Sequence, residues 1–201
     1  MKVFSQILSY LFHPLVIPTI GIFIIFNSGT YISNLVPEAK RLIYLLVFIS
    51  TFLFPVLMIP FLLWQKIIKT VYVETKKERI IPMLLTLIFY YFGYYIIGSN
   101  NISGLIRAFF LASIISLTAA FFINIKWKIS THMIGLGGLV GLVIGISLRL
   151  QVNLVQYLVI LIFISGIVGA ARLKLNSHNI LQIAAGFYIG ILLVLSTILF
   201  Y

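Results

Sequence analysis

Long apolar stretches follow one another along almost the whole chain, and this feature most constrains the fold. Each stretch is close to the 20 or so mainly apolar residues that an α-helix needs to cross a bilayer. Only 8% of the 201 residues are charged, whereas about a quarter are charged in a typical soluble domain. The chain therefore lacks the polar side chains to cover a water-facing surface, and lipid must surround most of its exterior.

Seven stretches are candidates for membrane-spanning helices, and the first is interrupted at its start. It covers 15–33, preceded by His13 and Pro14, so six or seven spans are both compatible with the sequence. Residues 3–12 are expected to form a short helix in the membrane interface. The remaining stretches are 42–64, 80–98, 104–125, 133–149, 153–170 and 179–200. The sequence thus predicts an all-α, polytopic transmembrane bundle in which 1–201 form a single domain.

Two of these stretches carry glycines spaced by four residues. Gly137, Gly141 and Gly145 lie on one, and Gly186 and Gly190 lie on another. Small residues at this spacing let helix backbones approach closely in lipid. We interpret them as packing residues.

Composition limits the chemistry that the chain can perform. It has no Cys and no Asp, and only three acidic residues, all Glu. Thiol nucleophiles, thiolate metal sites and paired-carboxylate mechanisms are therefore excluded or disfavoured, and we expect no metal and no cofactor. The net charge of +11 is gathered in short loops, which is typical of contacts with the bilayer surface. We find no nucleic-acid-binding module. The first 30 residues lack a small-residue cleavage site, so we expect them to belong to the mature chain.

Three polar clusters are expected to lie on the same face of the membrane. They are Arg79 with Pro82, Lys128–His132 and Arg172–His178, and two spans separate each cluster from the next. A chain that crosses twice returns to its starting face. The opposite face would hold Lys40, Arg41, Arg107 and Arg149.

His132 and His178 are the main candidates for chemistry, since ionisable groups at membrane depth are costly. Gln182 follows His178 by one helical turn, so its amide is able to accept a hydrogen bond from the imidazole and to determine which ring nitrogen is free. His13 is interpreted as an interfacial histidine without a role. Arg79, Lys128, Ser130 and Arg172 add donors beside expected helix starts, an arrangement suited to phosphate.

These residues resemble the three signatures of the type 2 phosphatidic acid phosphatase (PAP2) superfamily, in the same order. Arg172-Leu-Lys-Leu-Asn-Ser-His178 is similar to the third signature: Ser-Arg, five residues, His, three residues, Asp. Lys128-Ile-Ser130-Thr-His132 resembles the second, Pro-Ser-Gly-His. Arg79-Ile-Ile-Pro82 resembles the Arg-Pro end of the first. The resemblance covers about 79–186, within an expected PAP2-like catalytic half of about 79–200.

The resemblance implies a phosphatase acting on a phosphorylated lipid, such as a polyprenyl, glycerol or lipid A phosphate. His178 would be the nucleophile that forms a phosphohistidine, and His132 the general acid. The phosphoryl oxygens would be held by Arg172, Arg79, Lys128 and Ser130. Two alternatives are a catalytically inactive relative that binds anionic lipid headgroups and a small transporter.

The chain departs from the family pattern at four positions. Gln182 stands where the family has Asp, and it can orient the ring of His178 but cannot compensate its charge. Ala171 and Thr131 replace the Ser of the third signature and the Gly of the second. Tyr72 stands at the place of the Lys of the first signature, for which Lys76 or Lys77 would substitute.

Orientation has two indicators that disagree. With seven spans, ten of the fourteen Lys and Arg residues lie on the face of the three clusters, and the positive-inside rule would make that face cytoplasmic. The resemblance instead implies an extracytoplasmic site with a cytoplasmic C-terminus. We expect a multi-pass protein of the inner (plasma) membrane with the latter orientation.

Overall fold

The structure is a computed structural model and describes residues 2–70, 78–99 and 102–201. Tyr72, Lys76 and Lys77, the residues that bear on the first signature, lie outside these ranges, as do Glu74 and the loop residues 100–101.

Six long apolar helices form the bundle, and each is long enough to cross a membrane. They confirm the all-α, polytopic prediction. The first combines α3 (Pro37–Phe48), the π-helical η2 (Ile49–Leu53) and α4 (Phe54–Trp64), and the others are α5 (Ile80–Ser99), α6 (Gly104–Lys126), α7 (Thr131–Leu150), α8 (Val155–Lys174) and α9 (Ile180–Phe200). Large apolar side chains such as Phe163 and Leu181 are 70% and 71% exposed. This is a multi-pass membrane protein, since such a surface is stable in lipid and costly in water.

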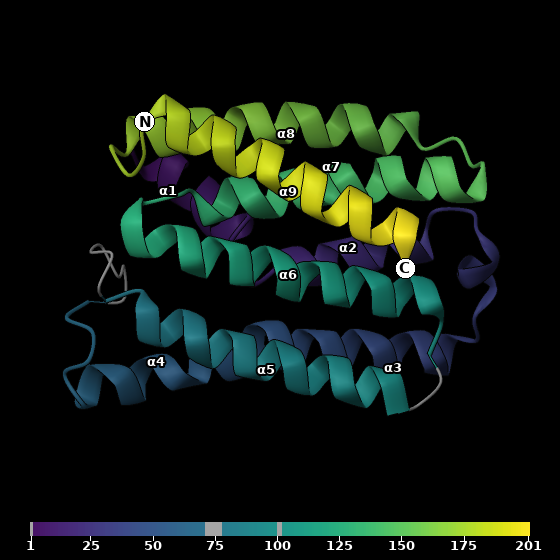
Figure 1. Cartoon of the computed structure of the whole chain (residues 1–201), viewed down its shortest axis with the longest axis horizontal. Coiled ribbons are helices and arrows are strands. Elements are labelled where there is room, and N and C mark those ends of the chain that lie inside the picture. Colours follow the sequence, from purple (N-terminus) through teal and green to yellow (C-terminus); the bar gives the residue numbers. More distant parts are fainter. Residues whose placement is uncertain (1, 71–77, 100–101) are drawn as a thin grey trace.

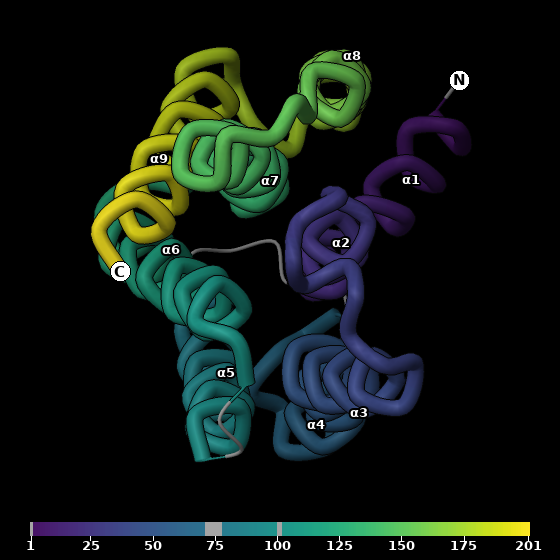
Figure 2. The backbone as a smooth tube through the Cα atoms, turned by 90° about the vertical axis from the view of Figure 1, so that its right-hand side faces the viewer, coloured from purple at the N-terminus to yellow at the C-terminus, as the bar shows by residue number. Residues whose placement is uncertain are grey.

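The first predicted span, 15–33, contains only a short helix. This helix is α2 (Ile17–Phe26). The 3₁₀ turn η1 (Tyr31–Asn34) follows it, and α1 (Lys2–Leu11) precedes it. Ten residues of helix measure about 15 Å, half of the hydrocarbon thickness. Pro14 and Pro18 confine the start of α2, and Gly29, with a φ of 69°, follows its end. Viewed along the bundle, α2 lies between the α7 and α3 ribbons (Figure 2), and it contacts α3, α6 and α7.

The second span continues through its two prolines. The π-helical turn Ile49–Leu53 comes directly before Pro55, and Pro60 lies inside α4. A widened turn is a usual way to accommodate a residue that cannot donate a backbone hydrogen bond.

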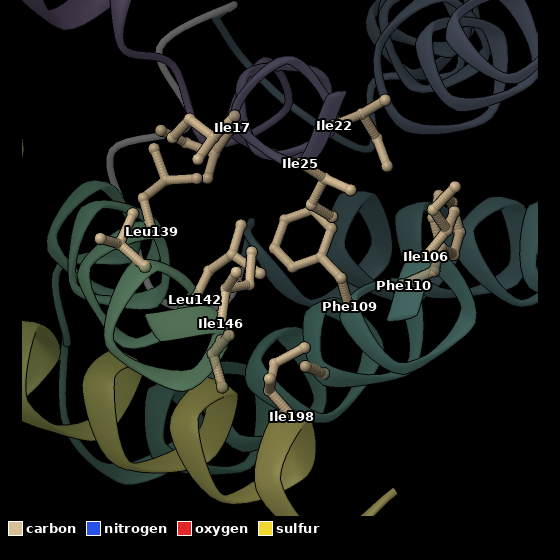
Figure 3. Packing of buried hydrophobic residues seen from close by; sticks show 14 of the residues in the cluster. Ile17, Ile22, Ile25, Ile106, Phe109, Phe110, Leu139, Leu142, Ile146 and Ile198 are labelled. Atoms are coloured by element: carbon tan, nitrogen blue, oxygen red, sulfur yellow. The ribbon is translucent and has the colours of Figure 1, made fainter. Parts of the chain in front are cut away.

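The hydrophobic core is built mainly between α2, α6, α7 and α9. Figure 3 shows side chains of these four helices pointing toward one another, with Phe109 of α6 close to Ile25 of α2. Gly21 makes room for this aromatic ring, since a Cβ at Gly21 would overlap the ring of Phe109. The fully buried large side chains include Ile22, Ile25, Ile106, Phe109, Phe110, Leu136, Leu139 and Leu142.

Helices α7 and α9 pack backbone against backbone. A Cβ at Gly190 would overlap the carbonyl of Ile134, and one at Gly137 would overlap the carbonyl of Phe187. A Cβ at Gly186 would lie 2.7 Å from the carbonyl oxygen of Ser130. The packing interpretation of these glycines is confirmed, and the same contacts hold the starts of α7 and α9 together.

The starts of α5, α7 and α9 and the ends of α6 and α8 all lie at one end of the bundle, on the left in Figure 1. We call this the polar end, because Arg79, Lys128–His132 and Arg172–His178 lie there. The span count therefore predicts correctly that the three polar clusters lie at the same end of the bundle. Helix α1 lies at the same end (Figure 1) and packs against α8.

Candidate functional site

His178 is held at the start of α9 by a capping box. Asn179, the N-cap residue, accepts a hydrogen bond from the Gln182 N–H at 2.9 Å, and Gln182 Oε1 accepts one from the Asn179 N–H at 3.2 Å. Gln182 Oε1 also lies 3.1 Å from Nδ1 of His178. The predicted contact between His178 and Gln182 is therefore present, and the cap fixes the amide that makes it.

This geometry determines the protonated nitrogen of His178. The Gln182 oxygen already accepts from a backbone N–H, so it faces Nδ1 as an acceptor, and Nδ1 must carry the proton. Nε2 then has a free lone pair. The side chain is 7% exposed, so it lies in a largely enclosed environment. Gln182 thus orients the imidazole of His178 so that Nε2 is the nitrogen with an available lone pair.

Ser130 joins the start of α7 to the start of α9. Its N–H donates to the Gln182 carbonyl at 3.4 Å. Its side chain is fully buried, and Oγ has no hydrogen-bond partner among the described residues. A buried hydroxyl without a partner costs about 1–3 kcal/mol. The hydroxyl of Ser130 is therefore a donor that a bound acceptor would stabilise.

Three cations act electrostatically on His178. Its pKa is lowered to about 4: burial is the largest cause, the bond to Gln182 opposes the shift, and Arg172, Arg79 and Lys128 add to it. Burial also lowers the pKa of Arg79. His178 is therefore neutral at physiological pH, in the form that can attack phosphorus, and the surrounding charge favours an anion.

Arg172 and His132 both contact α1. Nη1 of Arg172 donates to Ser9 Oγ at 3.3 Å, and Nε2 of His132 donates to the Ser9 carbonyl at 3.0 Å. Nε of Arg172 is buried and has no hydrogen-bond partner among the described residues. His132 itself is 8% exposed and interacts electrostatically with Arg172 and His178. The structure thus brings the predicted residues together, and it adds Ser9, which the sequence analysis did not identify.

His13 belongs to the same cluster, contrary to its interpretation as an interfacial residue without a role. Its ring meets that of His132 edge-on, with centroids 5.6 Å apart. Burial, and then Arg172, lower the pKa of His13 to about 4. The span count that places Lys2 on the face of the three clusters applies equally to His13, and this signal would have identified it.

A cavity of about 70 Å³ lies between α2, α5, α6 and α7. Pro14 and Thr131, the sequence neighbours of His13 and His132, line it together with the deeper Tyr90 and Phe109. Most of its lining is apolar, so it suits a small apolar group better than a polar one.

Within the described residues, no group of three or more His, Cys, Asp or Glu side chains is arranged to hold a metal ion. Comparison with known proteins adds no assignment: no family model, no curated protein and no solved structure matches this chain.

Proposed function

We propose that this chain is a PAP2-like phosphatase that removes the phosphate of a lipid, such as a polyprenyl, glycerol or lipid A phosphate, through a phosphohistidine at His178. The observation that carries the proposal is the orientation of His178: Nδ1 bonds to Gln182, so Nε2 is the nitrogen able to attack, and three cationic side chains act electrostatically on the ring. The inner (plasma) membrane is the proposed location, with the polar end extracytoplasmic.

The reaction takes two displacements. Nε2 of His178 attacks phosphorus, and a P–N bond forms as the P–O bond to the lipid breaks. The bound phosphate, as an anion, stabilises a protonated His132, and the lipid oxygen leaves with that proton. Water then attacks the phosphohistidine and gives a proton back to His132, and the P–N bond breaks to release inorganic phosphate.

Charge complementarity supports this assignment. Arg172, Arg79 and Lys128 would balance the phosphoryl oxygens, and the unpaired hydroxyl of Ser130 and the unpaired Nε of Arg172 would donate to them. Donors directed at developing charge are usually the largest single contribution to catalysis. Imidazole formally becomes cationic as it attacks, and Gln182 stabilises that cation less than a carboxylate would.

The lipid part of the substrate follows from the position of the site. The polar end closes a bundle whose exterior faces lipid, and the sequence neighbours of His13 and His132 line an apolar cavity inside it. A phosphate at this end would leave an attached chain within the hydrocarbon region.

Binding of an anionic headgroup without turnover is the second candidate. It is favoured by the neutral Gln182 beside the nucleophile and by the hydrogen bond that occupies Nε2 of His132. The two candidates share one site and differ in whether a covalent intermediate forms.

Trapping that intermediate separates them. Purified protein mixed with a lipid labelled with ³²P in its phosphate should gain an acid-labile, base-stable phosphoryl group, and inorganic phosphate should be released. His178→Asn should gain no label, whereas Arg149→Ala, a change at the opposite end of the bundle, should be labelled normally. Binding that depends on Arg172 with no label and no release would support the headgroup-binding candidate instead.

A further inference from the structure

Helix α1 is buried on its polar side and exposed on its apolar side. Its buried residues are Ser5 and Ser9, at 3% and 8% exposure. Most of its large apolar side chains are between 57% and 66% exposed, namely Val3, Phe4, Ile7, Tyr10 and Leu11, whereas Leu8 is half-buried. A helix with this pattern lies in the membrane interface with its apolar face in lipid. The buried and half-buried residues of α1, Ser5, Leu8 and Ser9, are the ones that the bundle covers.

Ser9 provides two of the contacts that hold α1. Its hydroxyl donates to the Ser5 carbonyl at 2.9 Å, so the oxygen remains able to accept the bond from Arg172. Its carbonyl accepts the bond from His132. These acceptors are oxygens, and they meet the same N–H groups that a phosphate would require.

We propose that α1 is a latch over the polar end, and that Ser9 competes with a phosphate for Arg172 and His132. The inference rests on the phosphate site proposed above and concerns its regulation. In the closed arrangement the N–H of His132 is bonded to Ser9. Release of α1 makes this N–H available to a leaving oxygen and opens the site to the lipid.

The segment between α1 and α2 is the place where α1 would pivot. Helix α1 ends at Leu11, and Pro14 disfavours a helical conformation at His13. The apolar face of α1 can stay in lipid in both arrangements, so opening exposes mainly Ser5 and Ser9 to the interface. Phosphate then replaces the acceptors that Ser9 withdraws.

Two substitutions at Ser9 should act in opposite directions on the affinity for inorganic phosphate, measured by calorimetry on the full chain. Ser9→Ala removes the acceptor for Arg172 in a residue that favours helix, so phosphate should bind about tenfold more tightly. Ser9→Glu places a carboxylate beside Arg172, so phosphate should bind about tenfold more weakly. If Ser9 were only a packing residue, both variants would bind more weakly than the wild type.

Cysteine labelling tests the opening directly, because the chain contains no native Cys. Ser5→Cys should react slowly with a polar maleimide, and inorganic phosphate or Arg172→Ala should accelerate the reaction several-fold. Gln6→Cys, at an exposed polar position of the same helix, should react at one fast rate under all of these conditions.

The outcomes separate the latch from the proposed function. If phosphate affinity decreases in the order Ser9→Ala, wild type, Ser9→Glu but no lipid phosphate is hydrolysed, the latch proposal is supported and the phosphatase proposal is wrong. Phosphate binding that depends on Arg172, with no such order and no change in Ser5→Cys labelling, would make α1 a fixed part of the site and overturn the latch. No phosphate binding that depends on Arg172 in any of the three proteins would overturn both.

Discussion

The two ends of the bundle both carry basic side chains, but they use them differently. At the opposite end, Nη1 of Arg149 donates to the Ile198 carbonyl at 2.7 Å in the last turn of α9, and Lys40 donates to the Ser33 carbonyl at 2.7 Å. These cations stabilise carbonyl groups that helices and turns leave unpaired. At the polar end, Arg172 repels Arg79 and acts electrostatically on three imidazoles, those of His13, His132 and His178.

The difference indicates which cations serve the fold and which serve a ligand. A cation that meets a helix end is stabilised by the chain itself. Cations that gather around neutral imidazoles destabilise one another, and an anion among them would remove that cost. The following predictions test this division, beginning with the largest expected effect.

His132→Ala should lower turnover of a lipid phosphate by about 10²–10⁴-fold, the usual contribution of general acid catalysis. Arg149→Ala, at the other end, should change turnover by less than about twofold while lowering the melting temperature, because it removes a cap of α9. Steady-state hydrolysis and thermal unfolding in the same detergent measure both effects. Equal losses of turnover in the two variants would contradict a functional difference between the ends.

Arg172→Ala should weaken the binding of inorganic phosphate or vanadate by about 10- to 150-fold, the equivalent of 1.5–3 kcal/mol for a charge-assisted hydrogen bond. Arg149→Ala should leave the affinity unchanged. Calorimetric titration of both variants makes the comparison. An affinity that is indifferent to Arg172 would place the anion elsewhere.

Gln182→Glu should raise turnover several-fold, since a carboxylate beside Nδ1 stabilises the imidazolium that forms on attack. The same charge should raise the pKa of His178 above about 4, and with it the acid limb of the pH–rate profile. Gln182→Asp should act in the same direction but less strongly, because Glu retains the length required by the capping box. An acid limb that stays in place in both variants would contradict the role of Gln182.

The protein should melt a few degrees lower at pH 5 than at pH 7.5. The pKa values of His13 and His178 are about 4 in the folded protein, whereas an unfolded histidine titrates near 6.5. Between these values the unfolded chain binds more protons, so stability falls as pH decreases through this window. The chain has three histidines, all at the polar end, and replacing His13 and His178 by Asn should reduce the drop. An unchanged drop would assign it to other groups.

Much of the fold could be predicted because the lipid bilayer restricts the sequence of a membrane-spanning helix in recognisable ways. Each of the six long helices must be a long apolar run, and the number of crossings determines on which side each polar cluster lies. The spacing of glycines on α7 and α9 indicates where backbones touch, because no other residue permits that approach. The bond between His178 and Gln182 is equally local, since four residues separate them on one helix.

The positions of α1 and α2 depended on tertiary structure. The stretch 15–33 has the apolar content of a span, yet α2 stops at Phe26 and fills a space inside the bundle that the neighbouring helices leave. The bonds of Ser9 join residues 123 and 163 positions apart. Contacts at that separation depend on how whole helices pack, and neither a serine nor a histidine in a sequence indicates which distant group it will meet. The sequence by itself therefore determined the helices, the polar end and the residues gathered there, and only the packing of the bundle decided that α1 would contact two of them, His132 and Arg172.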